Sequence, residues 1–459
     1  MAELPVFYER RLVGRIEIHA TGPTFTYSPE WLQTKAAFPL SSLMPLSPRP
    51  VASSVFMPWA ANLLPEAAAL KAVSLRLGAS QQDVIAILSE IGRDTAGALS
   101  IGEPGSTSPA EWREIPNAKA LERIIRELPN KPFLVGDDGV SMSLAGVQSK
   151  IGLARNERGK LCVPLYGAPS TFILKPDAID RLHGSVQNEA ICLVLARRCG
   201  LLAPPVTTGK AGSRSYLLVS RYDRVQQQGV WRRIHQEDFC QALGRTPDAK
   251  YESNQLGEPG PSLPEMFALT RNLMRAPDLL NLLDYVLFNV MVCNTDSHAK
   301  NYSMLISARG FQLAPIYDVM CAAAWDGITQ NLPQKIAGKN RGDHLKRRHW
   351  EAFAKDCGLN SGSVVSRIEA LVGVVQRELP HAIAEVEAMP AGTHFLIPEF
   401  RKAIEARGRR ILTGLAEGGT RASNRQPAPL HRQRKPKASE PIADVGVAKR
   451  RVRLKQVKT

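Results

Sequence analysis

The first hundred or so residues alternate between short apolar runs and turns. The stretch VFYERRLVGRIEIHA changes from apolar to polar and back, which predicts two short strands joined by a turn. The stretches LPEAAALKAVSLRLG and QQDVIAILSEIG place apolar residues at helical spacing, and GRDTAGALSI predicts a turn that leads into a strand. We therefore expect a small mixed α/β subdomain over residues 1–105.

The next block, residues 106–233, is dominated by strand patterns. After a connecting stretch with the helix NAKALERIIRELP, the segment VSMSLAGVQSKIGLA predicts a strand, a loop and a second strand. GKLCVPL and STFILKPD predict further strands, and APPVTTGKAGSRSYLLVSRYDR predicts two strands around the turn GKAGS. One helix interrupts them, because SVQNEAICLVLARRCGL has apolar residues at helical spacing and a stop signal at Gly200. We expect a strand-rich lobe here.

From residue 234 to about 415 the pattern is mostly helical. Strands followed by helices predict an α+β protein with two lobes and a cleft between them, a strand-rich lobe and a helical C-terminal lobe. The last residues, 416–459, combine low apolar content with high charge, which predicts a basic, disordered tail.

Composition narrows the class of protein. The chain has 459 residues, of which 44% are hydrophobic and 22% charged, as is ordinary for soluble globular proteins. No stretch reaches the roughly 18–20 uninterrupted apolar residues of a membrane span, and MAELPVFYERRLVG lacks a signal-peptide pattern. The seven Cys are dispersed without a C-x-x-C pair, which fits a reducing compartment. We expect a cytoplasmic protein without membrane contact.

The net charge of +16 is uneven along the chain. Most of the surplus lies after about residue 418, where Lys and Arg far outnumber Asp and Glu. The tail fits a solvated extension, and it also fits contact with nucleic acid or an acidic partner, because clustered Lys and Arg bind phosphates by releasing counterions.

The densest polar cluster, CNTDSHAKNYSML, directly follows the apolar stretch LLDYVLFNVMV. In it Asp296 and Asn301 are five residues apart, which is the D-x-x-x-x-N spacing of a protein-kinase catalytic loop. Phosphoryl transfer needs a carboxylate beside the nucleophile and oxygen ligands for a hard cation, and one short loop aims both at a single cleft. The spacing alone fits equally a polar turn that caps the buried helix.

Three further charged residues stand where a kinase would need them. We expect Asp318 at the end of a strand in FQLAPIYDVM, Lys175 at the end of the strand in STFILKPD, and Glu189 in the first turn of the next helix. A Lys beside the cleft neutralises nucleotide phosphates, and an acid on the following helix pairs with it. Each residue alone also fits a plain structural place: a strand-end turn, a surface lysine, or a first-turn acid favoured by the helix dipole.

A loop that covers phosphates should precede Lys175, and SLAGVQSKIGL lies between two expected strands. It contains only Gly146 and Gly152, so it matches neither G-x-G-x-x-G nor the P-loop pattern, and its Ser-Lys pair also fits an exposed turn. The order of the features favours a kinase more than any one of them does. Small-residue loop, strand Lys, helix Glu, two strands, helical lobe, D-x(4)-N and Asp318 follow one another as in a protein kinase.

With these motifs in place, the sequence resembles the HipA family of bacterial serine/threonine kinases, the toxin half of toxin–antitoxin pairs. The stretches that carry the resemblance are SLAGVQSKIGL, FILKPD, NEAICLVLARRCGL, SRYDR, QEDFCQALG, KYES, NTDSHAKNYS, LAPIYDV, YSPEWL, NLLPE and LSEIGRDTAGAL. The motif T-D-x-H-A-K-N followed by a Y-D segment is close to a family fingerprint. The resemblance covers roughly residues 1–415, and the tail lies outside it.

The resemblance implies a protein-kinase-like fold with a docked N-terminal subdomain, and ATP and Mg²⁺ as cofactors. It implies Asp296 as the catalytic base, Asn301 and Asp318 as metal ligands, and Lys175 on the nucleotide phosphates. The other cofactor-binding positions that it implies are the phosphate loop of Ala145, Gly146, Val147, Gln148, Ser149 and Lys150, the hinge of Ser220, Arg221 and Tyr222, and His298, Lys300 and Tyr317.

The resemblance implies regulation at Ser143, and the sequence departs from the family pattern at Ser220. Ser143 matches the family serine whose autophosphorylation expels the phosphate loop and switches the kinase off, since an added double-negative charge does not fit a phosphate site; the alternative is a plain strand serine. Ser220 stands where the family has an acidic residue, so an adenine contact through that side chain is in doubt. Tyr222 still offers an aromatic wall.

The expected function is that of an ATP-dependent serine/threonine protein kinase that phosphorylates a cytosolic protein of the translation apparatus. The family implies a small helix-turn-helix antitoxin of the HipB type as partner. No such motif is evident in this chain, so DNA contact is expected through the antitoxin or the basic tail. Two alternatives stay open: a kinase-like enzyme that phosphorylates a small molecule or lipid headgroup, and a non-catalytic, DNA-associated co-repressor.

Overall fold

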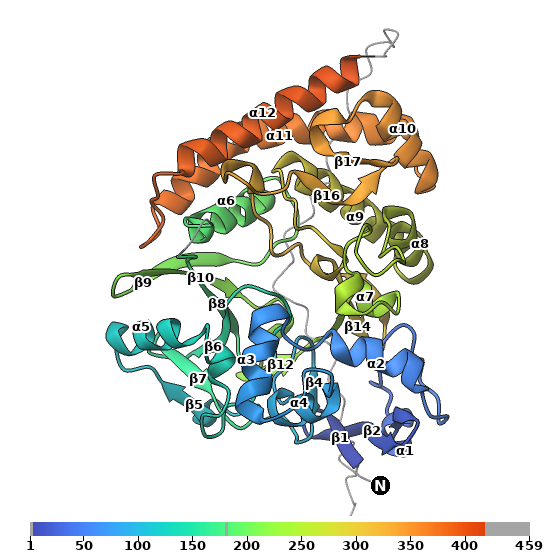
Figure 1. Cartoon of the computed structure of the whole chain (residues 1–459), viewed down its shortest axis with the longest axis vertical. Coiled ribbons are helices and arrows are strands. Elements are labelled where there is room, and N and C mark those ends of the chain that lie inside the picture. The colour runs from blue at the N-terminus through green and yellow to red at the C-terminus, as the bar shows by residue number, and fades with distance from the viewer. Residues whose placement is uncertain (1–2, 180–181, 418–459) are drawn as a thin grey trace, which may run out of the picture.

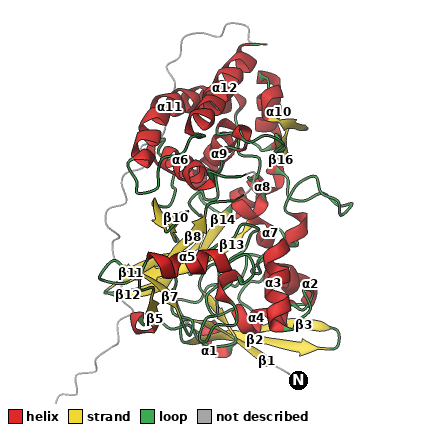
Figure 2. Cartoon of the chain, turned by 60° about the vertical axis from the view of Figure 1, so that its left-hand side comes forward, coloured by secondary structure: helices red, strands yellow, loops and turns green. Residues whose placement is uncertain are grey.

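The structure is a computed structural model that describes residues 3–179 and 182–417. In Figure 1 the helical C-terminal part lies at the top, and the two parts that contain most of the strands lie below it. Figure 2 shows the same division: the upper part is mostly helical, and the lower parts contain most of the strands together with further helices. Predictions that concern the tail after Glu417 lie outside the described residues.

The N-terminal part is an antiparallel sheet packed against short helices. Its four strands have the order β3-β2-β1-β4, so the last strand returns to pair with the first. Its elements are β1 (Glu3–Tyr8), β2 (Arg11–His19), β3 (Gly22–Tyr27), α1 (Pro29–Leu32), α2 (Ser53–Ala61), α3 (Ala67–Leu77), α4 (Val84–Ile91) and β4 (Leu99–Ile101). A cluster of buried side chains between sheet and helices, with Phe25, Phe56 and Trp59 among the largest, forms a core of its own.

The middle part is a six-stranded antiparallel sheet with the order β5-β7-β6-β8-β10-β9. Its elements are β5 (Trp112–Glu114), α5 (Ala118–Glu127), β6 (Ile151–Arg155), β7 (Leu161–Pro164), β8 (Phe172–Pro176), α6 (Ser185–Arg198), β9 (Val206–Ala211) and β10 (Arg214–Ser220), followed by the hairpin β11 (Arg224–Gln227) and β12 (Val230–Arg233). Helix α6 is buried along almost its whole length, which fits a helix enclosed between the sheet and the helical part.

The C-terminal part is mostly helical but also contains short strands. Its elements are β13 (His235–Asp238), α7 (Phe239–Ala242), α8 (Leu263–Leu273), α9 (Ala276–Met291), β14 (Ser303–Ser307), β15 (Gly310–Leu313), β16 (Asn331–Ile336), β17 (Lys339–Arg341), α10 (Arg347–Asp356), α11 (Ser361–Glu387) and α12 (Ile397–Ala416). Strands β13, β14 and β15 form a small sheet beside the loop that follows α9.

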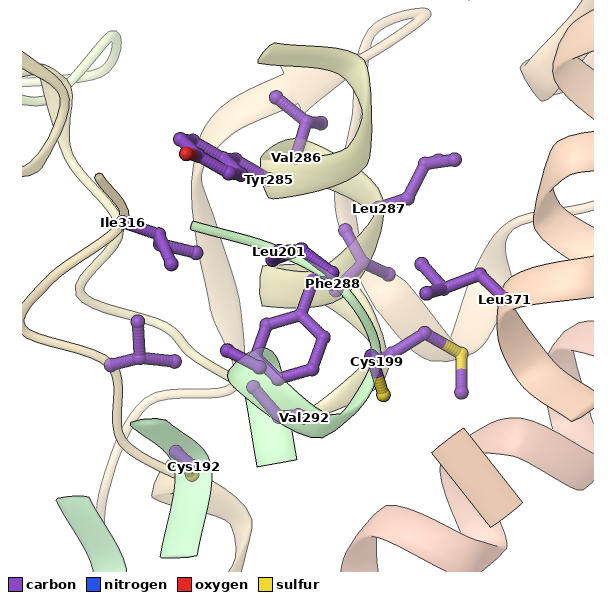
Figure 3. Packing of buried hydrophobic residues seen from close by; sticks show 14 of the residues in the cluster. Cys192, Cys199, Leu201, Tyr285, Val286, Leu287, Phe288, Val292, Ile316 and Leu371 are labelled. Atoms are coloured by element: carbon purple, nitrogen blue, oxygen red, sulfur yellow. The ribbon is translucent and has the colours of Figure 1, made fainter. Parts of the chain in front are cut away.

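Helix α9 is the apolar stretch that the sequence places before its polar cluster. Figure 3 shows Phe288 of α9 and Val292 at its end packed near Leu201 and Cys199, which follow α6, with Ile316 alongside. All five side chains belong to the largest buried cluster. The loop after α9 therefore starts from a rigid, fully packed support.

Three local expectations are wrong. Residues 141–144 do not form a strand, because their hydrogen bonds go to the N-terminal part: the Ser143 N–H donates to Asp94 O at 3.1 Å and the Ser141 hydroxyl donates to Glu90 O at 2.6 Å. Asp318 does not end a strand, since β15 stops at Leu313 and Asp318 has a left-handed backbone, with φ 57°.

Glu189 does not lie in the first turn of its helix, because α6 begins only at Ser185 and the acid comes in the second turn. The Asp177 carboxylate accepts hydrogen bonds from Gly184 N at 3.1 Å and Val186 N at 3.2 Å, so it caps the start of α6 in place of a first-turn acid.

Among the described residues, no helix is long and apolar enough to cross a membrane. The boundaries 1–105, 106–233, 234–415 and 416–459 stay predictions. The largest buried cluster combines helix α6 of the middle part with the C-terminal helices, so the buried clusters do not follow these boundaries.

Candidate active site

A cavity lies where the three parts of the chain meet, and several charged and polar side chains converge on it among apolar ones. Such a lining is typical of sites that bind small ligands. Most of the site residues predicted from the sequence line it, namely Ala145, Gly146, Lys150, Lys175, Glu189, Ser220, Arg221, Tyr222, His298, Lys300, Asn301, Tyr317 and Asp318. The structure thus brings residues from both lobes to one place.

The remaining predicted residues lie around the cavity and do not line it. Val147, Gln148 and Ser149 form the outer side of the phosphate loop, and Val147 is 56% exposed. Asp296 is next to the cavity, because its carbonyl oxygen accepts a hydrogen bond from the side-chain nitrogen of Asn301 at 2.7 Å. Ser143 is fully buried beneath the loop.

A buried ion cluster sits at one end of the cavity. The Lys175 ammonium, on strand β8, donates to Glu189 Oε1 at 2.7 Å and to Asp318 Oδ1. Burial works against the charged form of Lys175, but the carboxylates of Asp318 and Glu189 raise its pKa above the ordinary value. Burial likewise works against the charge of Asp318, but Lys175 and Lys150 lower its pKa. Lys175 and Asp318 therefore both stay charged at neutral pH.

Strand, helix and loop each contribute one member of this cluster. Lys175 pairs across the sheet with Leu217 of β10, and Glu189 projects from the buried helix α6. The left-handed backbone at Asp318 turns its side chain back toward Lys175. A Lys between two carboxylates provides a fixed positive charge beside an acid with free acceptor capacity.

A chain of amide side chains connects helix α9 to the predicted catalytic loop. Asn289 of α9 accepts a hydrogen bond from the Asn294 side chain at 2.9 Å, and Asn294 Oδ1 accepts one from the Asp296 N–H at 3.0 Å. The Tyr302 hydroxyl accepts a further hydrogen bond from Asn289 at 3.0 Å. The position of Asp296 is thereby fixed to the buried helix rather than to solvent-exposed loop contacts.

The Asp296 side chain is 55% exposed and lies next to the cavity. Its Oδ1 accepts a hydrogen bond from the Tyr251 hydroxyl at 2.6 Å and lies 3.8 Å from His298 Nε2. Partial burial raises the pKa of Asp296, and the hydrogen bond from Tyr251 opposes that rise. A carboxylate whose pKa is raised is a stronger proton acceptor than a free aspartate.

His298 and Lys300 occupy the cavity in different ways. Burial, together with the nearby charges of Lys250 and Lys300, holds the pKa of His298 well below its ordinary value, so the ring is neutral at pH 7. The Lys300 ammonium is fully engaged, with hydrogen bonds to Asn62 Oδ1 at 2.7 Å and Asp238 Oδ2 at 2.9 Å. Lys300 thus ties the catalytic loop to the N-terminal part.

The predicted phosphate loop, residues 145–150, is held by hydrogen bonds within it and from the N-terminal part. The Lys150 ammonium donates to Ala145 O at 2.7 Å, so Lys150 is buried and not part of an exposed turn. The Glu66 N–H donates to Gly146 O at 3.3 Å, and the Ser143 hydroxyl donates to Leu63 O at 2.6 Å. The N-terminal part therefore holds the loop through backbone groups.

In the predicted hinge, the Arg221 and Tyr222 side chains make different contacts. Arg221 turns away from the cavity centre, because its guanidinium binds the Asp223 carboxylate at 2.7 Å and the Ser170 hydroxyl at 2.8 Å. The Tyr222 and Tyr317 rings lie beside each other, tilted by 35° with centroids 5.6 Å apart, and both line the cavity. The Tyr317 hydroxyl also donates to Lys300 O at 2.6 Å. The role of Tyr222 as an aromatic wall for adenine stays a prediction.

Sequence reasoning missed four residues at the site. Asn62, Glu66 and Asp238 line the cavity, and Tyr251 contacts Asp296. These four residues lie in the stretches NLLPE, QEDFCQALG and KYES, which carry the family resemblance. Nothing in a single sequence, however, indicates that residue 62 lies beside residue 300. That contact depends on how the N-terminal part docks.

The residues present fit a magnesium ion. Asp318 supplies a carboxylate, and the Asn301 amide nitrogen donates to Asp296 O, which turns its Oδ1 the other way. Mg²⁺ is held in proteins by one or two such oxygens together with substrate phosphates. Within the described ranges, no group of three or more His, Cys, Asp or Glu side chains is arranged to hold a metal alone. The donor set therefore suits an ion that arrives with a nucleotide.

A site that joins a strand lysine, a helix glutamate and two loop aspartates is that of a protein-kinase-like enzyme. The family described as HipA-like C-terminal domain matches residues 142–381, and the HipA N-terminal domain matches residues 4–102. The chain is 36% identical over 380 residues to protein Y4mE of Sinorhizobium fredii, covering 80% of this chain and 89% of that protein.

The chain is also 32% identical over 396 residues to the serine/threonine-protein kinase toxin HipA of Shewanella oneidensis, covering 82% of this chain and 88% of that one. A solved complex of HipA, HipB and operator DNA from that organism has a similar chain, with a TM-score of 0.76 and 27% identity over 90% of this chain and 98% of that chain. The chain belongs to the HipA family and is a serine/threonine protein kinase of the HipA type. The predicted α+β fold is confirmed.

Proposed function

We propose that this kinase transfers the γ-phosphoryl group of ATP to a serine or threonine of a protein, with Asp296 as the general base. The observation that carries the proposal is that Lys175, Asp318 and the Asp296–Asn301 loop meet at one cavity. These residues lie far apart in the sequence, and phosphoryl transfer is the chemistry that needs all of them together.

Each residue has a defined part in the transfer. Lys175 binds the nucleotide phosphates and Tyr222 lies against the adenine. The acceptor oxygen forms a bond to the γ-phosphorus while the bond to the bridging oxygen of ADP breaks, and the acceptor proton passes to the Asp296 carboxylate. Asn301 and Asp318 would hold Mg²⁺, which neutralises charge on the phosphate oxygens when bound.

The phosphate loop carries the proposed regulation. Ser143 is buried, and its hydroxyl donates to Leu63 O, so it is not accessible while the loop is in place. Phosphorylation of Ser143 requires the loop to leave, and a phosphate at that buried position prevents its return because the charge has no partner there. We infer that autophosphorylation at Ser143 switches this kinase off.

The partners follow from the family. The Shewanella oneidensis HipA is in a complex with HipB and operator DNA. We propose that this chain likewise binds a helix-turn-helix antitoxin of the HipB type and acts as a growth-inhibiting toxin whose substrate is a cytosolic protein of the translation apparatus. Contact with DNA then occurs through the antitoxin, or through the basic residues after 418.

The test is the transfer of label from γ-labelled ATP into a bacterial protein extract and into the chain itself. We expect the wild type to label Ser143 and one extract protein, and Asp296→Asn to lose both while still binding ATP. The loss should be about 100- to 10,000-fold, the contribution of a general base. Label that enters metabolites or lipids but never protein would contradict the proposal.

A further inference from the structure

Tyr251 is the residue nearest the proposed base that the transfer scheme does not use. Its hydroxyl donates to Oδ1 of Asp296 at 2.6 Å, and its ring meets the His298 ring edge to face, with centroids 5.1 Å apart. Burial and the Asp296 charge raise the pKa of the Tyr251 phenol, so it stays protonated and donates at any ordinary pH. The phenol therefore keeps the proton that it donates to Asp296.

The backbone around Tyr251 is held on both sides. On one side the Ala299 N–H donates to Lys250 O at 3.1 Å, and the Lys250 ammonium binds Glu66 at 2.6 Å. On the other side the Glu252 N–H donates to Pro333 O at 3.1 Å. Lys250 also lies over the Tyr251 ring, 5.5 Å from its centre. Such support makes Tyr251 a fixed group, not a mobile lid.

The hydrogen bond from Tyr251 makes the two carboxylate oxygens of Asp296 different from each other. Oδ1 receives Tyr251 and has His298 Nε2 at 3.8 Å, whereas Oδ2 has no hydrogen-bond partner in the part of the chain that the structure describes. More than half of the Asp296 side chain is exposed, so Oδ2 is open to an incoming hydroxyl. A general base works best when a third group fixes its orientation and leaves the reacting atom free.

We propose that Tyr251 is a positioning residue that holds Oδ1 of Asp296 so that Oδ2 faces the acceptor hydroxyl. This inference rests on the proposed role of Asp296 as base. It assigns Tyr251 of the KYES segment a part in the transfer step, in which that segment contacts the predicted catalytic loop.

The test compares Tyr251→Phe with the wild type by the pH dependence of label transfer from γ-labelled ATP into the same protein extract. The Phe ring keeps the packing on His298 and Lys250, and only the hydroxyl is lost. A hydrogen bond to a carboxylate lowers its pKa, so losing it raises the Asp296 pKa. The acid limb should move to higher pH. The rate at saturating ATP should fall about tenfold, and the KM for ATP should not change.

Tyr166→Phe is the matched control. Its hydroxyl also binds an aspartate, Asp138, at 3.2 Å, but on the surface and away from the cavity. This variant should keep the wild-type rate and pH profile. A melting curve and ATP binding by calorimetry check that both variants fold.

The possible failures are distinguishable. A wild-type chain that labels no protein overturns the proposed function and the inference with it. A Tyr251→Phe chain with wild-type rate and profile overturns the inference alone. A faster Tyr251→Phe chain also overturns it, because the phenol would then occupy the place of the acceptor and block it.

Discussion

The two ends of the cavity are built by different means. At the catalytic end, charged side chains from the two lobes contact each other directly, as in the cluster of Lys175, Glu189 and Asp318. At the phosphate-loop end, the N-terminal part holds the loop mainly through backbone groups, such as Leu63 O and the Glu66 N–H. The charged residues of the site thus come from motifs with recognisable spacing, whereas the position of the loop depends on how the N-terminal part packs against it.

The largest effect should come from the catalytic end. Asp318→Asn removes the charge that pairs with Lys175 and supplies a metal ligand, so transfer from γ-labelled ATP should fall about 1,000-fold, as when a preorganised charged group is lost. Asp326→Asn, an exposed acid farther along the same loop, is the control and should keep full activity. Near-normal transfer by Asp318→Asn would show that the cluster is structural only.

The next largest effect should come from the contact between the N-terminal part and the β11–β12 hairpin. Asp94 is buried and binds Arg224 at 2.9 Å and Arg233 at 3.4 Å. Removing one partner leaves buried charges unpaired, so Asp94→Asn should lower the free energy of unfolding by about 3 kcal/mol in denaturant titrations at pH 7. Asp138→Asn, an exposed carboxylate, should change it little.

The same contact has a defined pH dependence. Burial works against the charge of Asp94, but Arg224, Arg221 and Arg233 hold its pKa below the ordinary value. Its stabilisation is therefore present above about pH 4, the unfolded pKa, and is lost as pH falls through the folded pKa. The stability difference between wild type and Asp94→Asn should shrink in acid. A difference that grows below pH 4 would contradict this.

The smallest effect should come from the loop closure itself. Ser143→Ala removes the hydrogen bond to Leu63 O and leaves a buried carbonyl without its donor, at a cost of about 1 kcal/mol. We expect a several-fold rise in the KM for ATP and faster hydrogen exchange over residues 145–150. Ser89→Ala, which removes a bond from Ser89 to Ala86 O within α4, is the control. An unchanged KM would mean that the loop closes without the N-terminal part.

The sequence indicated, for physical reasons, that Lys175, Glu189, Asn301 and Asp318 lie at one cavity. Kinase chemistry needs an acid, an amide and a lysine in a fixed order along the chain. The helix that supports Asp296 is also recognisable, because it is an apolar stretch directly before the loop. The missed parts depend on contacts between distant segments. Residues 141–144 look like a strand because they alternate, but their partners are Asp94 and Glu90, not a neighbouring strand.

Lys300 has contacts that its place within the motif does not indicate. The resemblance implies a nucleotide contact, which stays a prediction, and the structure adds hydrogen bonds from its ammonium to Asn62 and Asp238. Asp318 was expected at a strand end because an apolar run precedes it, and its left-handed backbone has no pattern in the sequence. Local spacing thus predicts which residues gather, and tertiary docking decides what each one touches.

The most direct test of the central claim is a proteome-wide comparison of phosphorylation in cells that express the wild type or Asp296→Asn. The account predicts one cytosolic protein, together with Ser143 of the chain, phosphorylated on serine or threonine only with the wild type. Identical phosphorylation in both cultures, with growth inhibited equally, would contradict it.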